Sequence, residues 1–162
     1  MTIRQAEKSD LNFILALYNE AILNTTAVYE YEPFTRDYIN RWFEEKMEHS
    51  FPVIIAEEAG IQIGFATYGT FRHRTAYRST VEHSVYVSAE HQGKGIGKML
   101  LTELIEIARG RKIHVMVGGI DAANPGSIAF HATLGFEKCA YMKEVAWKFD
   151  RWLDLVFMQK IL

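Results

Sequence analysis

The sequence has little cysteine, little proline and little net charge. Its single cysteine, Cys139, excludes an intramolecular disulfide and any zinc or iron–sulfur site built from several cysteines. Three prolines are spread along 162 residues, and no linker-like or repetitive stretch divides the chain. We therefore expect one domain over residues 1–162, because domains commonly have about this length.

Long apolar runs are also missing. No run approaches the roughly 18 residues of a membrane-spanning helix, and residues 1–8 are mixed polar, unlike a secretory signal. A formal net charge of -2 argues against a nucleic acid or a membrane surface as partner. The histidines are not spaced as metal ligands, so no metal is expected. These features favour a cytoplasmic protein.

The apolar pattern that is present alternates between strand and helix periods. A helix is predicted after Ser9 or Asp10, and another after Thr35 with Tyr38, Trp42, Phe43 and Met47 turned inward. Asn124 and Gly135 mark the two ends of a later helix. Strands are predicted at residues 3–6, 53–56, 61–67, 80–87 and 113–117, followed by a hairpin of 136–147 with 153–161 that buries Cys139. This order predicts an α+β fold, with helices packed on a mixed sheet.

A glycine-rich segment, Gln92 to Lys98, directly follows the strand at 80–87 and opens a helix. Glycines there let backbone N–H groups approach a phosphate at the positive end of the helix dipole. The spacing matches neither the P-loop nor the dinucleotide fingerprint. It does match Gln-x-x-Gly-x-Gly, as Gln92, Gly95 and Gly97. A flexible surface turn is the alternative interpretation.

With this loop and the segment from Asn124 to Phe136, the chain resembles the GNAT superfamily of acyl-coenzyme A-dependent N-acetyltransferases. Residues 81–87, His131 and residues 148–155 resemble more narrowly the phosphinothricin and methionine-sulfoximine N-acetyltransferases. The resemblance implies the GNAT fold, with a mixed, mostly antiparallel sheet, and acetyl-coenzyme A as co-substrate. It also implies a homodimer and a detoxifying transfer of acetyl to the α-amino group of a small amino acid or analogue.

The resemblance also implies site residues. Backbone groups of Val85, Tyr86 and Val87 would pair with the pantetheine arm, and Asn124 would bond it as well. The pyrophosphate would lie in the loop of Gln92, Gly93, Lys94, Gly95, Ile96, Gly97 and Lys98. The substrate would contact Arg72, His73, Arg74, Glu82 and His83.

Glu82 is the candidate general base, on the strand face opposite His83. Burial would have to raise the pKa of its carboxyl from about 4.3 for it to act near neutrality. The alternatives are an exposed strand residue or an anchor for the substrate ammonium. His131 stands where many members of the superfamily carry a tyrosine, and it would protonate the leaving thiolate or hold the substrate. A helix histidine bonded to a nearby carbonyl is the other interpretation.

The basic loop of residues 72–74 suits a substrate carboxylate, because arginine binds carboxylates with a planar fork. Arg72 is the first choice, and a solvated loop is the alternative. Tyr29, Tyr31 and Phe34 are candidates for an apolar wall beside the substrate. Other functions consistent with the sequence are acetylation of a polyamine or a protein N-terminus, a non-catalytic acyl-coenzyme A-binding module, and a nucleotide-binding module.

Overall fold

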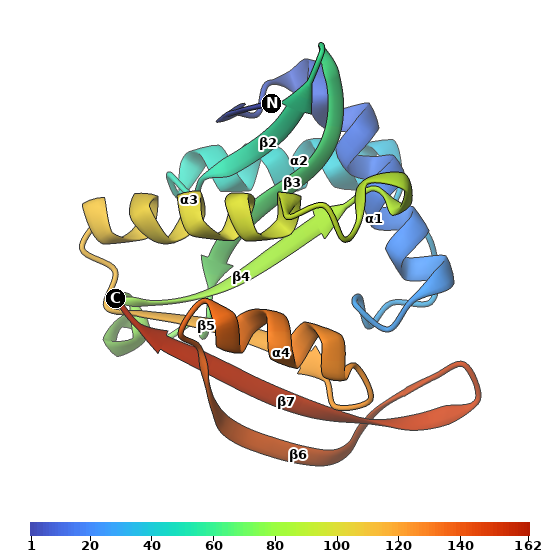
Figure 1. Cartoon of the computed structure of the whole chain (residues 1–162), viewed down its shortest axis with the longest axis vertical. Helices are drawn as coiled ribbons and strands as arrows, with labels where there is room; N and C mark the ends of the chain where they lie inside the picture. Colours follow the sequence, from blue (N-terminus) through green and yellow to red (C-terminus); the bar gives the residue numbers. More distant parts are fainter.

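The computed structural model describes all of residues 1–162. Its seven strands form a single sheet in the order β1-β2-β3-β4-β5-β7-β6, flanked by four α-helices (Figure 1). In chain order the elements are β1 (Thr2–Gln5), η1 (Lys8–Asp10), α1 (Leu11–Asn24), α2 (Arg36–Glu48), β2 (Val53–Glu58), β3 (Ile61–Thr70), η2 (Thr75–Tyr77), β4 (Thr80–Val87), η3 (Ala89–His91), α3 (Ile96–Gly110), β5 (Val115–Asp121), α4 (Pro125–Thr133), β6 (Glu137–Lys148) and β7 (Arg151–Ile161).

Strand pairing confirms the predicted α+β class. Every neighbouring pair is antiparallel except β4 with β5, which run parallel, so the sheet is mixed and mostly antiparallel. No helix in the structure is both long enough and apolar enough to span a bilayer.

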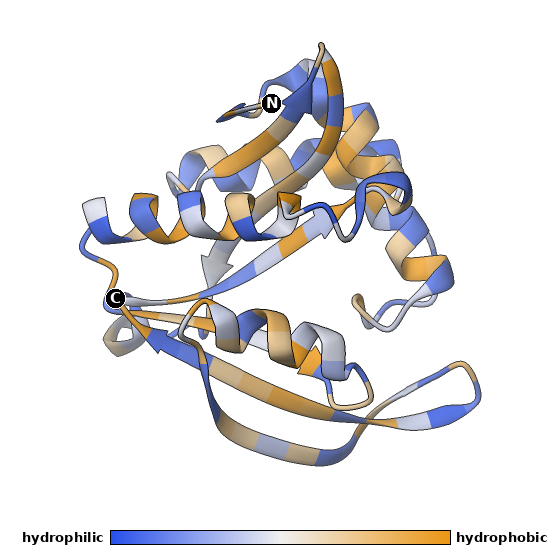
Figure 2. Ribbon diagram, in the orientation of Figure 1, coloured by the Kyte–Doolittle hydropathy of each residue, from blue (hydrophilic) through white to orange (hydrophobic).

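The sheet carries a hydrophobic core on each face, because its central strands are buried on both sides. In β2, Ile54 and Ala56 pack with α3, whereas Val53 and Ile55 pack with α1 and α2. This alternation follows from the two-residue period of a strand. Figure 2 shows the apolar residues concentrated along β2, β3 and the inner side of α1.

One feature of the sheet positions the site: β4 and β5 separate after a short contact. They pair only through Thr80, Val81 and Glu82, opposite residues 115–117. Beyond these pairs β4 runs on to Val87 beside β3, and β5 runs on to Asp121 beside β7. Figure 1 shows the two strands diverging. The sheet is therefore open along one edge of β4 at its centre.

Several predicted element ends are confirmed, because local side chains determine them. Thr35 accepts a hydrogen bond from the N–H of Tyr38 at 3.2 Å, and Asn124 accepts one from the N–H of Ser127 at 2.9 Å. Gly135 follows α4 with a φ of 81°, the left-handed conformation expected at that position.

The predicted inward face of α2 is partly wrong. Phe43 is buried and Trp42 is half-buried against the core, as predicted. Tyr38 and Met47 are exposed, and Ile39 is buried instead. The sequence has neighbouring apolar pairs at 38–39 and 42–43, so the helical period alone does not choose between the two faces.

The start of the first helix also differs from the prediction. Asp10 does not cap α1; its buried carboxylate binds the Arg4 guanidinium at 2.8 Å and accepts the N–H of Glu7 at 2.7 Å. The bond to Arg4 lowers the pKa of Asp10 to about 2. The 3-10 turn η1 therefore leads into α1 and is held by an ion pair.

Two predictions for the second half of the chain are corrected. The strand predicted at 113–117 begins at Val115 and continues to Asp121, through Gly118 and Gly119, which interrupt its apolar run. Cys139, expected to be buried, is exposed, because it belongs to β6, an edge strand that is exposed along almost its whole length.

Candidate active site

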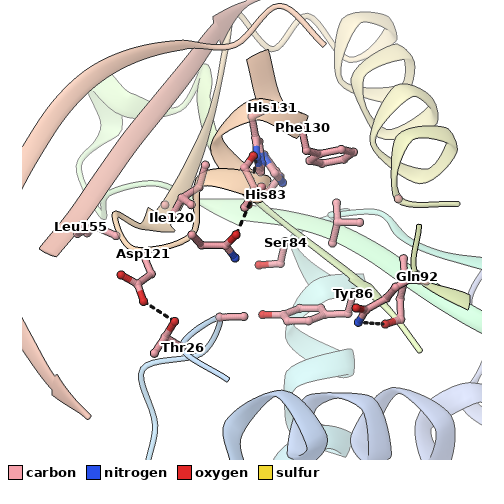
Figure 3. A pocket seen from close by; sticks show the side chains of 18 of the residues that line it. Thr26, His83, Ser84, Tyr86, Gln92, Ile120, Asp121, Phe130, His131 and Leu155 are labelled. Carbon is pink, nitrogen blue, oxygen red and sulfur yellow. Dashed lines mark hydrogen bonds between the residues drawn. The ribbon is translucent and has the colours of Figure 1, made fainter. Parts of the chain in front are cut away.

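A cavity of about 840 Å³ lies where β4 and β5 separate. Figure 3 shows it walled by β4, by the end of β5, by α4 and by the segment after α1. Of the residues predicted from the sequence, the cavity brings together Glu82, His83, Val85, Tyr86, Val87, Gln92, Gly93, Gly97, Asn124 and His131.

One edge of β4 is free along this cavity. Residues 83–87 pair with β3 on one side but have no partner strand on the side of β5. The carbonyl oxygen of Val87 accepts a hydrogen bond from the Gln92 side chain at 3.1 Å. An extended ligand can therefore take the place of a strand beside β4.

The glycine loop ends at the amino terminus of α3. Gly93 and Gly95 have φ angles of 74° and 82°, a left-handed conformation that favours glycine. The backbone N–H groups of residues 93–98 donate to no acceptor within the chain. The side chains of Lys94 and Lys98 are exposed, whereas Ile96 is buried and offers only its N–H. Together with the helix dipole, these free N–H groups suit a phosphate.

Glu82 lies on the face of β4 that turns away from His83. A Cβ atom at position 119 would lie 3.2 Å from Oε1 of Glu82, so Gly119 leaves space for this carboxylate. No hydrogen bond or ion pair within the chain holds this carboxylate. Burial raises the pKa of Glu82 above its usual value, which is the condition that a base near neutrality requires.

His83 and His131 stack on the opposite face of the sheet. Their ring centroids are 5.1 Å apart, with the ring planes at 27° (Figure 3). Nδ1 of His131 lies 2.7 Å from the carbonyl oxygen of Ser127. A carbonyl only accepts, so Nδ1 carries the hydrogen and Nε2 of the neutral ring is an acceptor. The alternative of a helix histidine bonded to a carbonyl therefore holds, and the same ring also lines the cavity.

Both imidazoles are buried, and burial favours their neutral forms. It lowers the pKa of His131 from its usual value. Burial, together with the neighbouring His131, lowers the pKa of His83 to about 3. Both nitrogens of His83 and Nε2 of His131 have no hydrogen-bond partner within the chain.

The sequence interpretation missed part of the cavity wall. Thr26 and Asp121 line it and are joined by a hydrogen bond of 2.5 Å, visible in Figure 3. Asp121 was missed because the strand was predicted to end at Val117; an acidic residue at the end of the longer strand is the signal that would have found it. Of the three residues considered for an apolar wall, Tyr29 lines the cavity, while Tyr31 and Phe34 do not.

The basic loop lies outside the cavity. Arg72, His73 and Arg74 follow β3, are exposed and are not among the lining residues. The guanidinium of Arg72 lies over the ring of Phe71, 5.6 Å from its centroid. In the β3–β4 register Gly69 is paired with Glu82, so Arg72 follows the partner of Glu82 by three residues.

Known proteins resemble this chain over its whole length. Residues 14–136 match the acetyltransferase (GNAT) family. The chain is 46% identical over 159 residues to the L-methionine sulfoximine/L-methionine sulfone acetyltransferase of Salmonella typhimurium, covering 98% of this chain and 93% of that protein.

Two solved structures extend the comparison. A ribosomal-protein-alanine N-acetyltransferase from Brucella melitensis superposes with a TM-score of 0.98 and 47% identity, covering 100% of both chains. A phosphinothricin acetyltransferase from Sinorhizobium meliloti, in complex with acetyl-coenzyme A, gives a TM-score of 0.96 and 42% identity, covering 99% of this chain and 88% of that one.

Proposed function

The chain belongs to the acetyltransferase (GNAT) family, and we propose that it moves acetyl from acetyl-coenzyme A to the α-amino group of a small amino acid. It has the GNAT fold and is an N-acetyltransferase. Methionine sulfoximine, methionine sulfone and phosphinothricin are the substrates we favour, because similar proteins carry their names. Acetylation would neutralise the charged amine of these compounds, which is consistent with a detoxifying role.

The observation that carries this proposal is the opening between β4 and β5. It leaves one strand edge free for an extended acetyl donor. It also puts the half-buried, unpaired carboxylate of Glu82 at the point where the strands part. The proposed site of the acetyl donor and the proposed base, Glu82, therefore border a single cavity, as direct transfer between two bound substrates requires.

The residues present fit acetyl-coenzyme A. The free edge at Val85, Tyr86 and Val87 suits the amide groups of the pantetheine arm. Asn124 uses its Oδ1 to cap α4, which leaves its amide hydrogens available to the same arm. The free N–H groups from Gly93 to Lys98 suit the pyrophosphate, with Lys94 and Lys98 adding positive charge.

Transfer requires a proton to leave the substrate ammonium before its nitrogen attacks the thioester carbon. In our proposal Glu82 takes this proton, directly or through a water molecule. As the N–C bond forms and the C–S bond breaks, the nitrogen loses a second proton and the sulfur needs one. His131 is suited to this exchange, since its bare Nε2 can take up a proton and pass it on. His83, stacked on His131, faces the same space.

For the substrate carboxylate we propose the basic loop after β3. Arg72 is three residues beyond the partner of Glu82 in the strand register, and Arg74 and His73 extend the positive charge. An amino acid places its carboxylate one carbon from its amine. The guanidinium would therefore have to turn toward Glu82 when substrate binds.

A protein N-terminus is the second candidate, favoured by the name of the similar Brucella melitensis structure. Release of coenzyme A should be measured with methionine sulfone, with spermidine and with an alanine-headed peptide. We expect clear turnover of methionine sulfone. Preference for the peptide or for spermidine would overturn the amino-acid assignment.

We also propose a homodimer in the cytoplasm. The edge strand β6 exposes several apolar side chains, which a second copy would cover: Tyr141, Met142, Val145 and Trp147. A single unpaired cysteine suits a reducing compartment.

A further inference from the structure

Lys148, at the end of β6, is a buried lysine with no carboxylate partner. The residue is 4% exposed. Its Nζ donates to the carbonyl oxygens of Ile22, Thr25 and Val28, at 2.6, 2.8 and 2.7 Å. A lysine ammonium has three N–H donors, so each is matched by one carbonyl. This complete matching offsets the cost of removing the charge from water.

The three carbonyls lie at and just beyond the carboxyl end of α1. That helix ends at Asn24, has no basic residue in its last turn and is followed by Thr25 rather than by glycine. Its terminal carbonyls and the negative end of its dipole therefore need a cation from elsewhere. Lys148 supplies that cation from more than 120 residues further along the chain.

The same bonds fix one wall of the cavity. The carbonyls of Thr25 and Val28 bracket Thr26 and Ala27, both of which line the cavity, and Tyr29 follows directly. Two further contacts hold this segment, which we define as residues 25–31: the bond from Thr26 to Asp121, and a bond of 2.6 Å from the Tyr31 hydroxyl to the carbonyl of Trp147. Lys148 and Trp147 are adjacent on β6.

In the proposed function the acetyl donor occupies the free edge of β4 and the glycine loop, which leaves the rest of the cavity for the acceptor. The segment meets the cavity beside Asp121 and Leu155, on the side opposite Gln92 of the glycine loop (Figure 3). We infer that Lys148 is a positioning residue for the amine substrate, holding residues 25–31 as the wall against which that substrate packs. This inference rests on the proposed function only in taking the acceptor to be a small amine that reaches this wall.

A second, half-buried lysine provides a control. Lys46 on α2 donates to one carbonyl, that of Tyr68 at 2.8 Å, and lies between the rings of Trp42 and Phe51. It does not line the cavity. Replacing either lysine by methionine removes a cation that donates to backbone carbonyl oxygen, but only Lys148→Met removes the bonds to the segment of residues 25–31.

The test compares the steady-state kinetics of Lys148→Met and Lys46→Met with methionine sulfone as acceptor. For Lys148→Met we expect the KM for methionine sulfone to rise about tenfold and the KM for acetyl-coenzyme A to stay within about twofold. Lys46→Met should change neither. Equal changes in both KM values, or an unchanged KM for the acceptor, would overturn the inference. If the wild type does not acetylate methionine sulfone, it is the proposed function that fails.

Amide hydrogen exchange tests the same inference without turnover. Exchange at residues 25–31 should rise in Lys148→Met and remain at the wild-type rate in Lys46→Met. If Lys148→Met does not fold, Lys148→Arg replaces it, since the planar guanidinium cannot place one N–H on each of the three carbonyls as the ammonium does. Unchanged exchange at residues 25–31 in the folded variant would contradict the inference.

Discussion

At the residue scale, the candidate acid–base groups lie on the two opposite faces of β4. Glu82 points to one side, unpaired and raised in pKa by burial, while His83 points to the other, against His131. Neighbouring residues of a strand face opposite ways. Because the sheet opens beside them, both faces reach one cavity.

The proposed role of Glu82 as general base leads to the first prediction. Glu82→Gln should lower kcat at least about tenfold, because a positioned base commonly contributes this much or more. Affinity for acetyl-coenzyme A, measured by calorimetry, should not change, since the groups proposed to bind it are the backbone of residues 85–87, the glycine loop and Asn124, not the side chain of Glu82. Glu103→Gln, an exposed change on α3, is the control. Unchanged turnover in Glu82→Gln would remove Glu82 as the base.

The pH dependence of the reaction is a second prediction. A base acts only when deprotonated, and burial raises the pKa of Glu82 above its usual 4.5. The value of kcat/KM should therefore fall as the pH drops through this raised pKa, well before an ordinary carboxyl would be protonated. The acid limb of the pH profile gives the measurement. An acid limb that reports the pKa of an ordinary carboxyl group would contradict the assignment of Glu82 as the base.

His83 leads to a prediction about stability. Its pKa is about 3 in the folded chain, against 6.5 for an ordinary histidine. Between these values the unfolded chain binds a proton that the folded chain excludes, so stability falls as the pH falls from about 6.5 toward 3. The slope contributed by this one group approaches about 1.4 kcal/mol per pH unit.

Denaturant unfolding between pH 6.5 and 4.5 measures this slope. His83→Leu should remove most of this slope of the unfolding free energy with pH. The control His49→Gln, at an exposed histidine, should leave the slope unchanged. A wild-type slope that survives in His83→Leu would show that other groups cause the acid sensitivity.

At the scale of elements, the glycine loop can be tested against a second turn with the same backbone. Gly95 and Gly60 have φ angles of 82° and 80°, and neither has an atom within 4 Å of where a Cβ would stand. Alanine at either position should cost roughly 1–2 kcal/mol of stability, because the left-handed conformation strains a residue with a Cβ.

Only Gly95→Ala should also raise the KM for acetyl-coenzyme A, since Gly60 lies in the β2–β3 turn, far along the chain from the loop. Steady-state kinetics and denaturant unfolding of the two variants separate strain from binding. An equal effect of both variants on this KM would mean that the loop does not hold the pyrophosphate.

The elements that could be predicted from the sequence are those fixed by nearby residues. Thr35, Asn124 and Gly135 form their capping contacts within a few positions, so their patterns are local. The predicted buried face of α2 was partly wrong because two faces are similarly apolar. The contacts at the carboxyl end of α1 could not be predicted, because the cation that binds its carbonyls, Lys148, belongs to a distant strand.

The same distinction applies to the candidate site. Glu82, His131 and the glycine loop occur in compact motifs, and the fold brings most of their residues to one cavity. Asp121 and Thr26 meet only because a loop after α1 crosses the end of β5. Such a contact depends on the tertiary path of the chain, so neither segment by itself indicates that the two residues meet.

At the scale of the whole molecule, β6 leaves an apolar surface uncovered. Its residues from Glu137 to Val145 are all exposed. Sedimentation should give about twice the chain mass of 18.6 kDa. Met142→Lys, in the middle of this strand, should shift the protein toward one chain, because a buried charge opposes association. A single-chain mass for the wild type at all concentrations would contradict the dimer.

The central claim is that donor and acceptor meet in the opening between β4 and β5. A crystal structure with coenzyme A and methionine sulfone tests it most directly. We predict electron density for the pantetheine arm along Val85, Tyr86 and Val87, and the amine of methionine sulfone about 3 Å from Glu82, directly or through one water. A pantetheine arm elsewhere, or an amine remote from Glu82, would contradict the account.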